Sequence, residues 1–138
     1  MKKFLFYFLL VFLLSILSAS KAYSQPPTVT HEVIAYTMAM TVIDNFNMID
    51  TKSDATTTTV QMYGKYLTEE TAKILIIQQI VRRYSDVSIV FPWSYYQGYL
   101  ATILHIDNME NYEIIILIKE DNYGCELYIS VIDKTHKI

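Results

Sequence analysis

The sequence contains few of the residues that build disulfides, phosphate-binding loops and nucleic-acid surfaces. Cysteine occurs once in 138 residues, as Cys125, so no intramolecular disulfide can form. We expect a buried, inert thiol, and a bond to a second chain is the alternative. Three glycines are too few for a glycine-rich nucleotide loop. The two arginines stand together as Arg82 and Arg83, and without a larger basic cluster nucleic acid is not an expected partner.

Metal-binding and catalytic motifs are also missing. His31-Glu32 begins like a zinc-protease motif, but Ala35 stands where the second histidine is needed. The three histidines have no ligand spacing, and no nucleophile motif is present. We therefore predict no metal and no cofactor, and the sequence favours a protein that is not an enzyme.

His105 and Asp107 are the candidates for acid–base catalysis. They lie two residues apart at the end of a predicted strand, so their side chains share a face. An imidazole beside a carboxylate can transfer protons in a pocket. The simpler interpretation is a strand that runs into a turn, where both side chains are solvated.

The amino-terminal residues have the layout of an export signal. Two lysines precede residues 4–20, which carry no charge, and small residues follow. We predict a signal peptide over residues 1–24, cleaved before Gln25; cleavage before Lys21 is the second choice. The 17 uncharged residues are fewer than the about 20 of a membrane-spanning helix. The expected location is the periplasm or the outside of the cell, and an uncleaved membrane anchor at residues 4–20 is the alternative.

Cleavage would leave a single domain, residues 25–138. Three of the 11 basic residues and none of the 14 acidic ones would be lost with the signal, which changes the net charge from −3 to −6. An acidic domain without disulfides depends on its apolar core for stability and favours a basic partner.

Apolar periodicity predicts helices first and strands afterwards. Residues 31–49 carry an apolar stripe at helical spacing, about five turns long. Thr68 is a typical cap for a second helix that ends at Ser85-Asp86. Residues 51–59 read as a polar connection, and a short helix at 54–63 stays undecided because four consecutive threonines disfavour it.

From Val87 onwards the apolar period changes to two. This predicts strands at 87–91, ending at Pro92, at 95–106, with Gly98 as a bulge, and at 112–119 and 125–132, joined by a hairpin turn. The strand at 112–119, rich in isoleucine, is expected in the centre. The fold prediction is α+β, with N-terminal helices packed on a curved antiparallel sheet of about four strands.

Five aromatic residues crowd into a segment of nine around Pro92, and they are the candidates for partner binding: Phe91, Trp93, Tyr95, Tyr96 and Tyr99. Exposed tryptophan and tyrosine anchor protein interfaces and stack on sugar rings. Alternate residues of a strand face opposite ways, so Tyr95 and Tyr96 cannot both point inward. The alternative is that these rings close the core at a strand corner.

The order of elements resembles the cone-shaped fold of the nuclear transport factor 2 superfamily. Within it, the chain is similar to the IcmL-like periplasmic domain of type IV secretion components, through Ala39–Asn47 and through Tyr66-Leu67-Thr68-Glu69 at the entry to the second helix. The resemblance implies a sheet that wraps a long helix, and a place in a secretion complex.

These features predict an exported, non-enzymatic protein-binding domain, an accessory of an envelope or secretion complex. One alternative is a small-molecule-binding or enzymatic cone-fold domain that uses His105 and Asp107. Others are a periplasmic immunity-type inhibitor and a carbohydrate-binding module.

Overall fold

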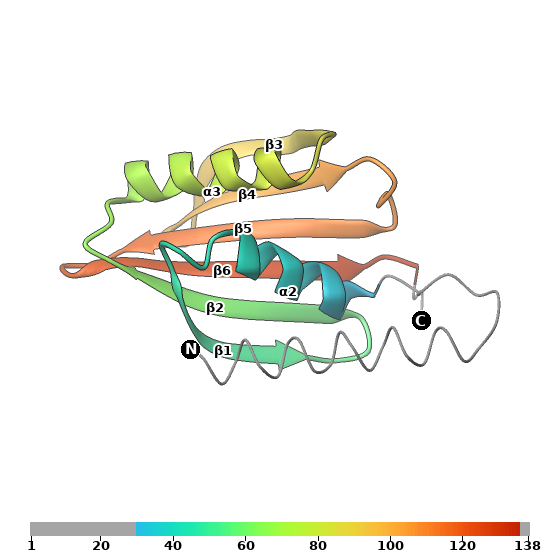
Figure 1. Cartoon of the computed structure of the whole chain (residues 1–138), viewed down its shortest axis with the longest axis horizontal. Helices are drawn as coiled ribbons and strands as arrows, with labels where there is room; N and C mark the ends of the chain where they lie inside the picture. Colours follow the sequence, from blue (N-terminus) through green and yellow to red (C-terminus); the bar gives the residue numbers. More distant parts are fainter. Residues whose placement is uncertain (1–29, 136–138) are drawn as a thin grey trace. The chain divides into compact units, whose positions relative to one another are not determined.

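The computed structural model describes residues 30–135 (Figure 1). The predicted signal peptide and the alternative anchor fall outside these residues. Within them, neither helix combines the length and the hydropathy that a membrane span requires.

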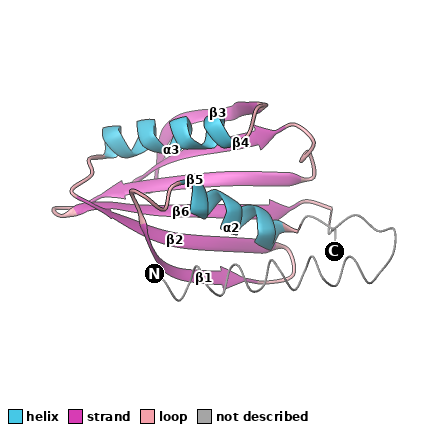
Figure 2. Ribbon diagram, viewed as in Figure 1, coloured by secondary structure: helices cyan, strands magenta, loops and turns pink. Residues whose placement is uncertain are grey.

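The described part of the chain forms two helices and a six-stranded antiparallel sheet, in the strand order β1-β2-β6-β5-β4-β3. Figure 2 shows both helices across one face of the sheet, where α2 packs on β2 and β6 and α3 packs on β5. In chain order, the elements are α2 (His31–Thr41), β1 (Asn47–Ser53), β2 (Thr57–Lys65), α3 (Glu69–Arg83), β3 (Val87–Tyr96), β4 (Tyr99–Ile106), β5 (Tyr112–Glu120) and β6 (Gly124–Asp133).

The prediction of about four strands behind N-terminal helices is wrong, because the sheet has six strands and α3 lies between two of its hairpins. The additional strands are β1 and β2, formed by residues that were expected as the end of the first helix, a polar connection and an undecided helix. Thr57, Thr58 and Thr59 fit this hairpin because β-branched side chains favour extended backbone. Asp54 makes the turn by accepting hydrogen bonds from the backbone N–H groups of Thr56 and Thr57, both at 2.9 Å.

The first helix is shorter than the 31–49 prediction and ends at Thr41. The chain then turns, and the N–H groups of Asn45 and Phe46 donate to the carbonyl of Val42. Phe46 still reaches the core, but Ile49 is 55% exposed on β1. Turn-forming polar residues at 44 and 45 outweigh the helical spacing of the apolar ones.

The boundary between β3 and β4 also differs from the prediction. β3 continues through Pro92, which an edge strand tolerates because its outer side needs no ladder hydrogen bond. The strand expected from residue 95 is interrupted by a two-residue turn at Gln97 and Gly98, whose φ angles are 50° and 85°. Positive φ at both positions is typical of the tight hairpin turns that match strand twist.

The second predicted helix is confirmed as α3, with Thr68 as its cap. The Thr68 hydroxyl accepts a hydrogen bond from the N–H of Thr71 at 3.2 Å. Glu69 and Glu70 lie in its first turn and Arg82 and Arg83 in its last, where their charges complement the helix dipole.

One core joins the helices to the sheet. The isoleucine-rich strand is central, as predicted, with β6 and β4 as its neighbours. Its core-facing side chains and those of β6 are fully buried: Ile114, Ile116, Ile118, Cys125, Leu127, Ile129 and Val131. The alternation of apolar and polar residues therefore gave the correct buried face for both strands.

Two glycines allow β2 and β6 to approach closely at one end of the sheet. Gly64 pairs with Cys125, beside the pair of Lys65 and Gly124. A Cβ atom on Gly124 would lie 2.1 Å from the carbonyl oxygen of Gly64. Because the atom in conflict is backbone, a side chain here requires the strands to separate.

We predict that Gly124→Ala lowers the free energy of unfolding by about 2 kcal/mol, the range in which overpacked sites fall. Urea denaturation measures it as a shift of the midpoint at constant slope. Gly98→Asn is the control, because open space surrounds Gly98 and asparagine tolerates positive φ. Equal midpoints for Gly124→Ala and the wild type would contradict the close approach.

Candidate functional site

The structure divides the five predicted binding residues between the two faces of the sheet. Tyr95 and Tyr96 are 71% and 65% exposed, and Phe91 is 50% exposed. Tyr95 pairs with the buried Leu100 and so points to the helix side, whereas Tyr96 pairs with Tyr99 on the opposite face. The five rings therefore do not form one continuous surface.

Trp93 and Tyr99 are engaged within the domain. Trp93 is half-buried and packs against the core. Tyr99 makes an edge-to-face contact with Tyr128, with ring centroids 5.9 Å apart, and the Lys119 Nζ lies 5.2 Å from its ring centroid. Packing within the domain is therefore the better account of these two rings.

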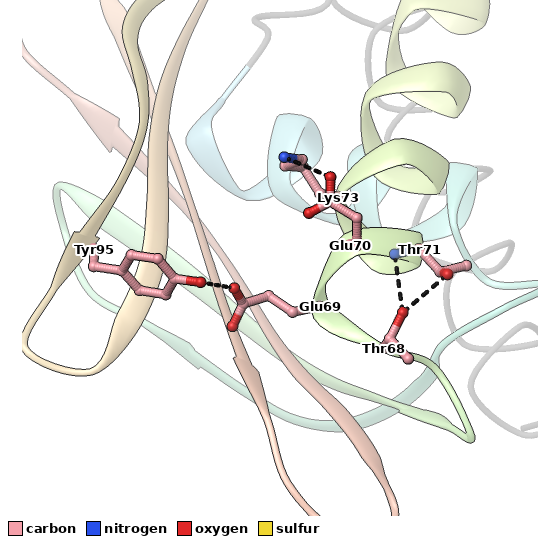
Figure 3. Close-up of polar contacts among 6 residues, drawn as sticks. All are labelled: Thr68, Glu69, Glu70, Thr71, Lys73 and Tyr95. Atoms are coloured by element: carbon pink, nitrogen blue, oxygen red, sulfur yellow. Dashed lines mark hydrogen bonds and ion pairs between the residues drawn. The ribbon is translucent and has the colours of Figure 1, made fainter.

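Tyr95 contacts the start of α3, as Figure 3 shows. Its hydroxyl donates a hydrogen bond to the Glu69 carboxylate, which raises the pKa of the phenol. The Thr68 cap fixes the first turn of α3 and so places Glu69 opposite the edge strand. Glu70 in the same turn forms an ion pair with Lys73 at 3.1 Å.

More carboxylates come to the same place from the end of β5 and the turn after it. Glu120 accepts a hydrogen bond from the backbone N–H of Glu69 at 2.6 Å. Burial, together with the charges of Glu120, Glu69 and Asp121, raises the pKa of the Cys125 thiol to about 11. The thiol is buried, as predicted, and stays protonated and unreactive near neutral pH.

Two exposed tyrosines that no sequence pattern indicated lie at the same end of the sheet. Tyr66 is 90% exposed and Tyr123 is 75% exposed, and the N–H of Tyr66 donates to the carbonyl of Tyr123 at 2.7 Å. Tyr66 has a φ of 63°, a left-handed conformation that is rare for an aromatic residue. The aromatic–acidic end, as we name this region, consists of Tyr66, Tyr95, Tyr123, Glu69, Glu120 and Asp121.

Asp121 organises the hairpin turn that carries Tyr123. Its Oδ1 accepts hydrogen bonds from the Tyr63 hydroxyl at 2.7 Å and from the N–H groups of Tyr123 and Gly124 at 2.8 and 2.9 Å. The Tyr63 contact, followed by the backbone donors, lowers the pKa of Asp121. The same contact raises the pKa of Tyr63 to about 12.

The predicted acid–base pair is not held together. The His105 Nδ1 and the nearest Asp107 oxygen are 4.0 Å apart, too far for a hydrogen bond, and the Asp107 side chain is 63% exposed. This geometry fits the simpler interpretation of a strand that runs into a turn.

Among residues 30–135, no group of three or more His, Cys, Asp or Glu side chains has an arrangement that could hold a metal ion. Comparisons with family models, curated proteins and solved structures found no match to the chain. The resemblance to the nuclear transport factor 2 superfamily stays a prediction.

We predict that Asp121→Asn destabilises the domain near neutral pH and that the deficit shrinks in acid. A carboxyl whose pKa is lowered on folding stabilises the folded state at pH values above its ordinary pKa, which is 3.8 for Asp121. This stabilisation is lost as the pH falls through the lowered pKa. Urea midpoints at pH 7 and pH 3 measure the difference between variant and wild type.

Tyr63→Phe provides the control, because it removes the largest cause of the shift and keeps the backbone donors. Between pH 7 and pH 3, the urea midpoint of Tyr63→Phe should fall less than that of the wild type and more than that of Asp121→Asn. A deficit of Asp121→Asn that is the same at both pH values would refute the role of the charge.

Proposed function

We propose that the chain is an exported, non-enzymatic binding domain whose aromatic–acidic end receives a basic segment of a partner protein. The observation that carries the proposal is a set of contacts at one end of the sheet. Tyr95 and Glu120 both contact Glu69. The exposed Tyr66 bonds through its backbone to the exposed Tyr123, in the turn that Asp121 organises. Lys73 does not neutralise this group, because its ion pair is with Glu70.

The chemistry of the region suits lysine and arginine. Tyrosine faces attract ammonium and guanidinium groups by about 0.5–1 kcal/mol at exposed sites. Carboxylates add charge-assisted hydrogen bonds, which are bidentate with arginine. The net charge expected after signal cleavage, −6, would steer a basic partner towards the domain.

The export and the setting of the domain belong to the same proposal. The basic start and the uncharged residues 4–20 support secretion across a membrane. The resemblance of Tyr66-Leu67-Thr68-Glu69 to the entry of a helix in the IcmL-like domain is part of the same proposal, and α3 begins at Glu69. An accessory of an envelope or secretion complex, or an immunity-type inhibitor of a basic toxin, would present such a surface.

A short lysine-rich peptide with a fluorescent label tests the proposal in solution. We expect anisotropy to report binding that weakens as salt rises, because exposed charges are screened. Tyr95→Ala should weaken it two- to fivefold, the size of one exposed cation–π contact. Glu69→Gln should weaken it as well, although its amide oxygen can still accept from Tyr95.

Glu110→Gln is the matched charge control. Glu110 lies in the turn before β5, whereas Glu120 lies at the last residue of that strand. The control should bind as the wild type does. Equal binding of a glutamate-rich peptide of the same length, or equal loss in Glu110→Gln, would rule out recognition of a basic segment at the aromatic–acidic end.

A further inference from the structure

The face of the sheet that lies opposite the helices carries half-buried apolar side chains. α2 packs on β2 and β6 and α3 packs on β5, both from the same side, and among residues 30–135 no helix lies across the other side (Figure 2). Along β4, β5 and β6, fully buried side chains that face the core alternate with partly exposed ones that point away from it. The open face, as we name this surface, is centred on Ala101, Ile103, Ile115, Leu117, Tyr128 and Ser130.

The strand pairings arrange these six side chains in two rows that run across β4, β5 and β6. The first row consists of Ala101, Leu117 and Tyr128, and the second row consists of Ile103, Ile115 and Ser130. Each row has an aliphatic side chain in its centre, with one small and one large neighbour. The small neighbour lies on β4 in the first row and on β6 in the second, so the two rows are complementary in size.

We propose that two copies of the chain associate through their open faces, around a two-fold axis that is parallel to the sheet and crosses β5 at right angles, at the level of Ile116. The strands of the two copies then run within about 30° of antiparallel, and the first row of each copy packs on the second row of the other. The facing pairs are Ala101 with Ile103, Leu117 with Ile115, and Tyr128 with Ser130. A large side chain thus meets a smaller one on both sides of a central aliphatic pair.

Two charged side chains at the ends of β5 favour the antiparallel orientation over a parallel one. Glu113 and Lys119 lie on the open face, at equal distances along the strand from Ile116. In the antiparallel dimer, Lys119 of each copy faces Glu113 of the other. In a parallel dimer, each would face its own counterpart, which brings like charges together. Lys119 also pairs with Glu126 of its own chain and contacts the Tyr99 ring, so its side chain is held on the open face.

The edge strand β3 extends both rows. Ser94 pairs with Ala101 and Phe91 pairs with Ile103, so Ser94 joins the first row and Phe91 joins the second. In the dimer, Phe91 of each copy therefore packs over Ser94 of the other, which again places a large side chain against a small one. Phe91 is 50% exposed in the single chain, and the second copy covers it.

The size of the open face indicates a weak, reversible dimer. The residues from Glu113 to Lys119 span about 20 Å, and the axes of β3 and β6 lie about 15 Å apart. A contact of these dimensions is smaller than the about 800 Å² that each partner of a stable complex buries. We therefore expect monomer and dimer to coexist at micromolar concentrations.

Sedimentation equilibrium of the mature chain and of two charge reversals measures the dissociation constant of the dimer. Glu113→Lys and Lys119→Glu should each weaken the dimer about tenfold, because the two-fold axis makes each substitution turn two attractive contacts into repulsive ones. The double variant should return to within about twofold of the wild type, because the facing charges are again opposite. The two positions are about 20 Å apart in one chain, too far for direct contact, so this rescue requires the second copy.

Glu110→Lys is the control, because it makes the same change of charge as Glu113→Lys in the turn before β5 and should not weaken the dimer. Tyr95→Ala should also leave the dimer unchanged, because the open face shares no residue with the aromatic–acidic end, and the two proposals therefore fail separately. Urea midpoints show whether each variant is folded, which matters most for Lys119→Glu beside Glu126. A monomer at every concentration would overturn the proposal, and so would a double variant that dimerises no more tightly than the single ones.

Discussion

Burial of one face of the two central strands is the constraint on which the rest of the structure depends. Ile116 on β5 and Ile129 on β6 are paired neighbours and fully buried, and both helices cover that face. The apolar residues of α2 and α3 find their partners there, through Met38 and Ile76 among others. Because this face is filled by side chains, polar chemistry is displaced to the ends of the helices and the edges of the sheet.

The start of α3 is one such helix end, and polar side chains from three elements meet there. Glu120, at the end of the central strand β5, accepts a hydrogen bond from the backbone N–H of Glu69. The Glu69 carboxylate in turn accepts a hydrogen bond from Tyr95 on the edge strand β3. The helix cap thus joins the middle and the edge of the sheet at one point. The close approach of Gly64 and Gly124 brings the β5–β6 turn, with Tyr123, to the same end. The aromatic–acidic end therefore results from the way in which the core is closed.

Local sequence signals predicted the elements that depend on local chemistry. Thr68 identified the start of α3, and the alternation around Ile116 identified the central strand. The first helix was overestimated, because the apolar spacing persists to Ile49 although the chain turns at Asn45. The β1–β2 hairpin was missed because a run of threonines is consistent with either a polar connection or a strand, and only pairing with β6 decides between them.

The candidate site shows the same limit. Alternation predicted that Tyr95 or Tyr96 would be exposed, but the partner of Tyr95 is Glu69, 26 residues away, and no local pattern indicates such a contact. The two helix starts also differ in chemistry. α3 begins with hydrogen bonds to the Thr68 hydroxyl and the Glu120 carboxylate. α2 instead begins at His31, whose imidazole contacts the Thr58 hydroxyl and the carbonyl of Ala55.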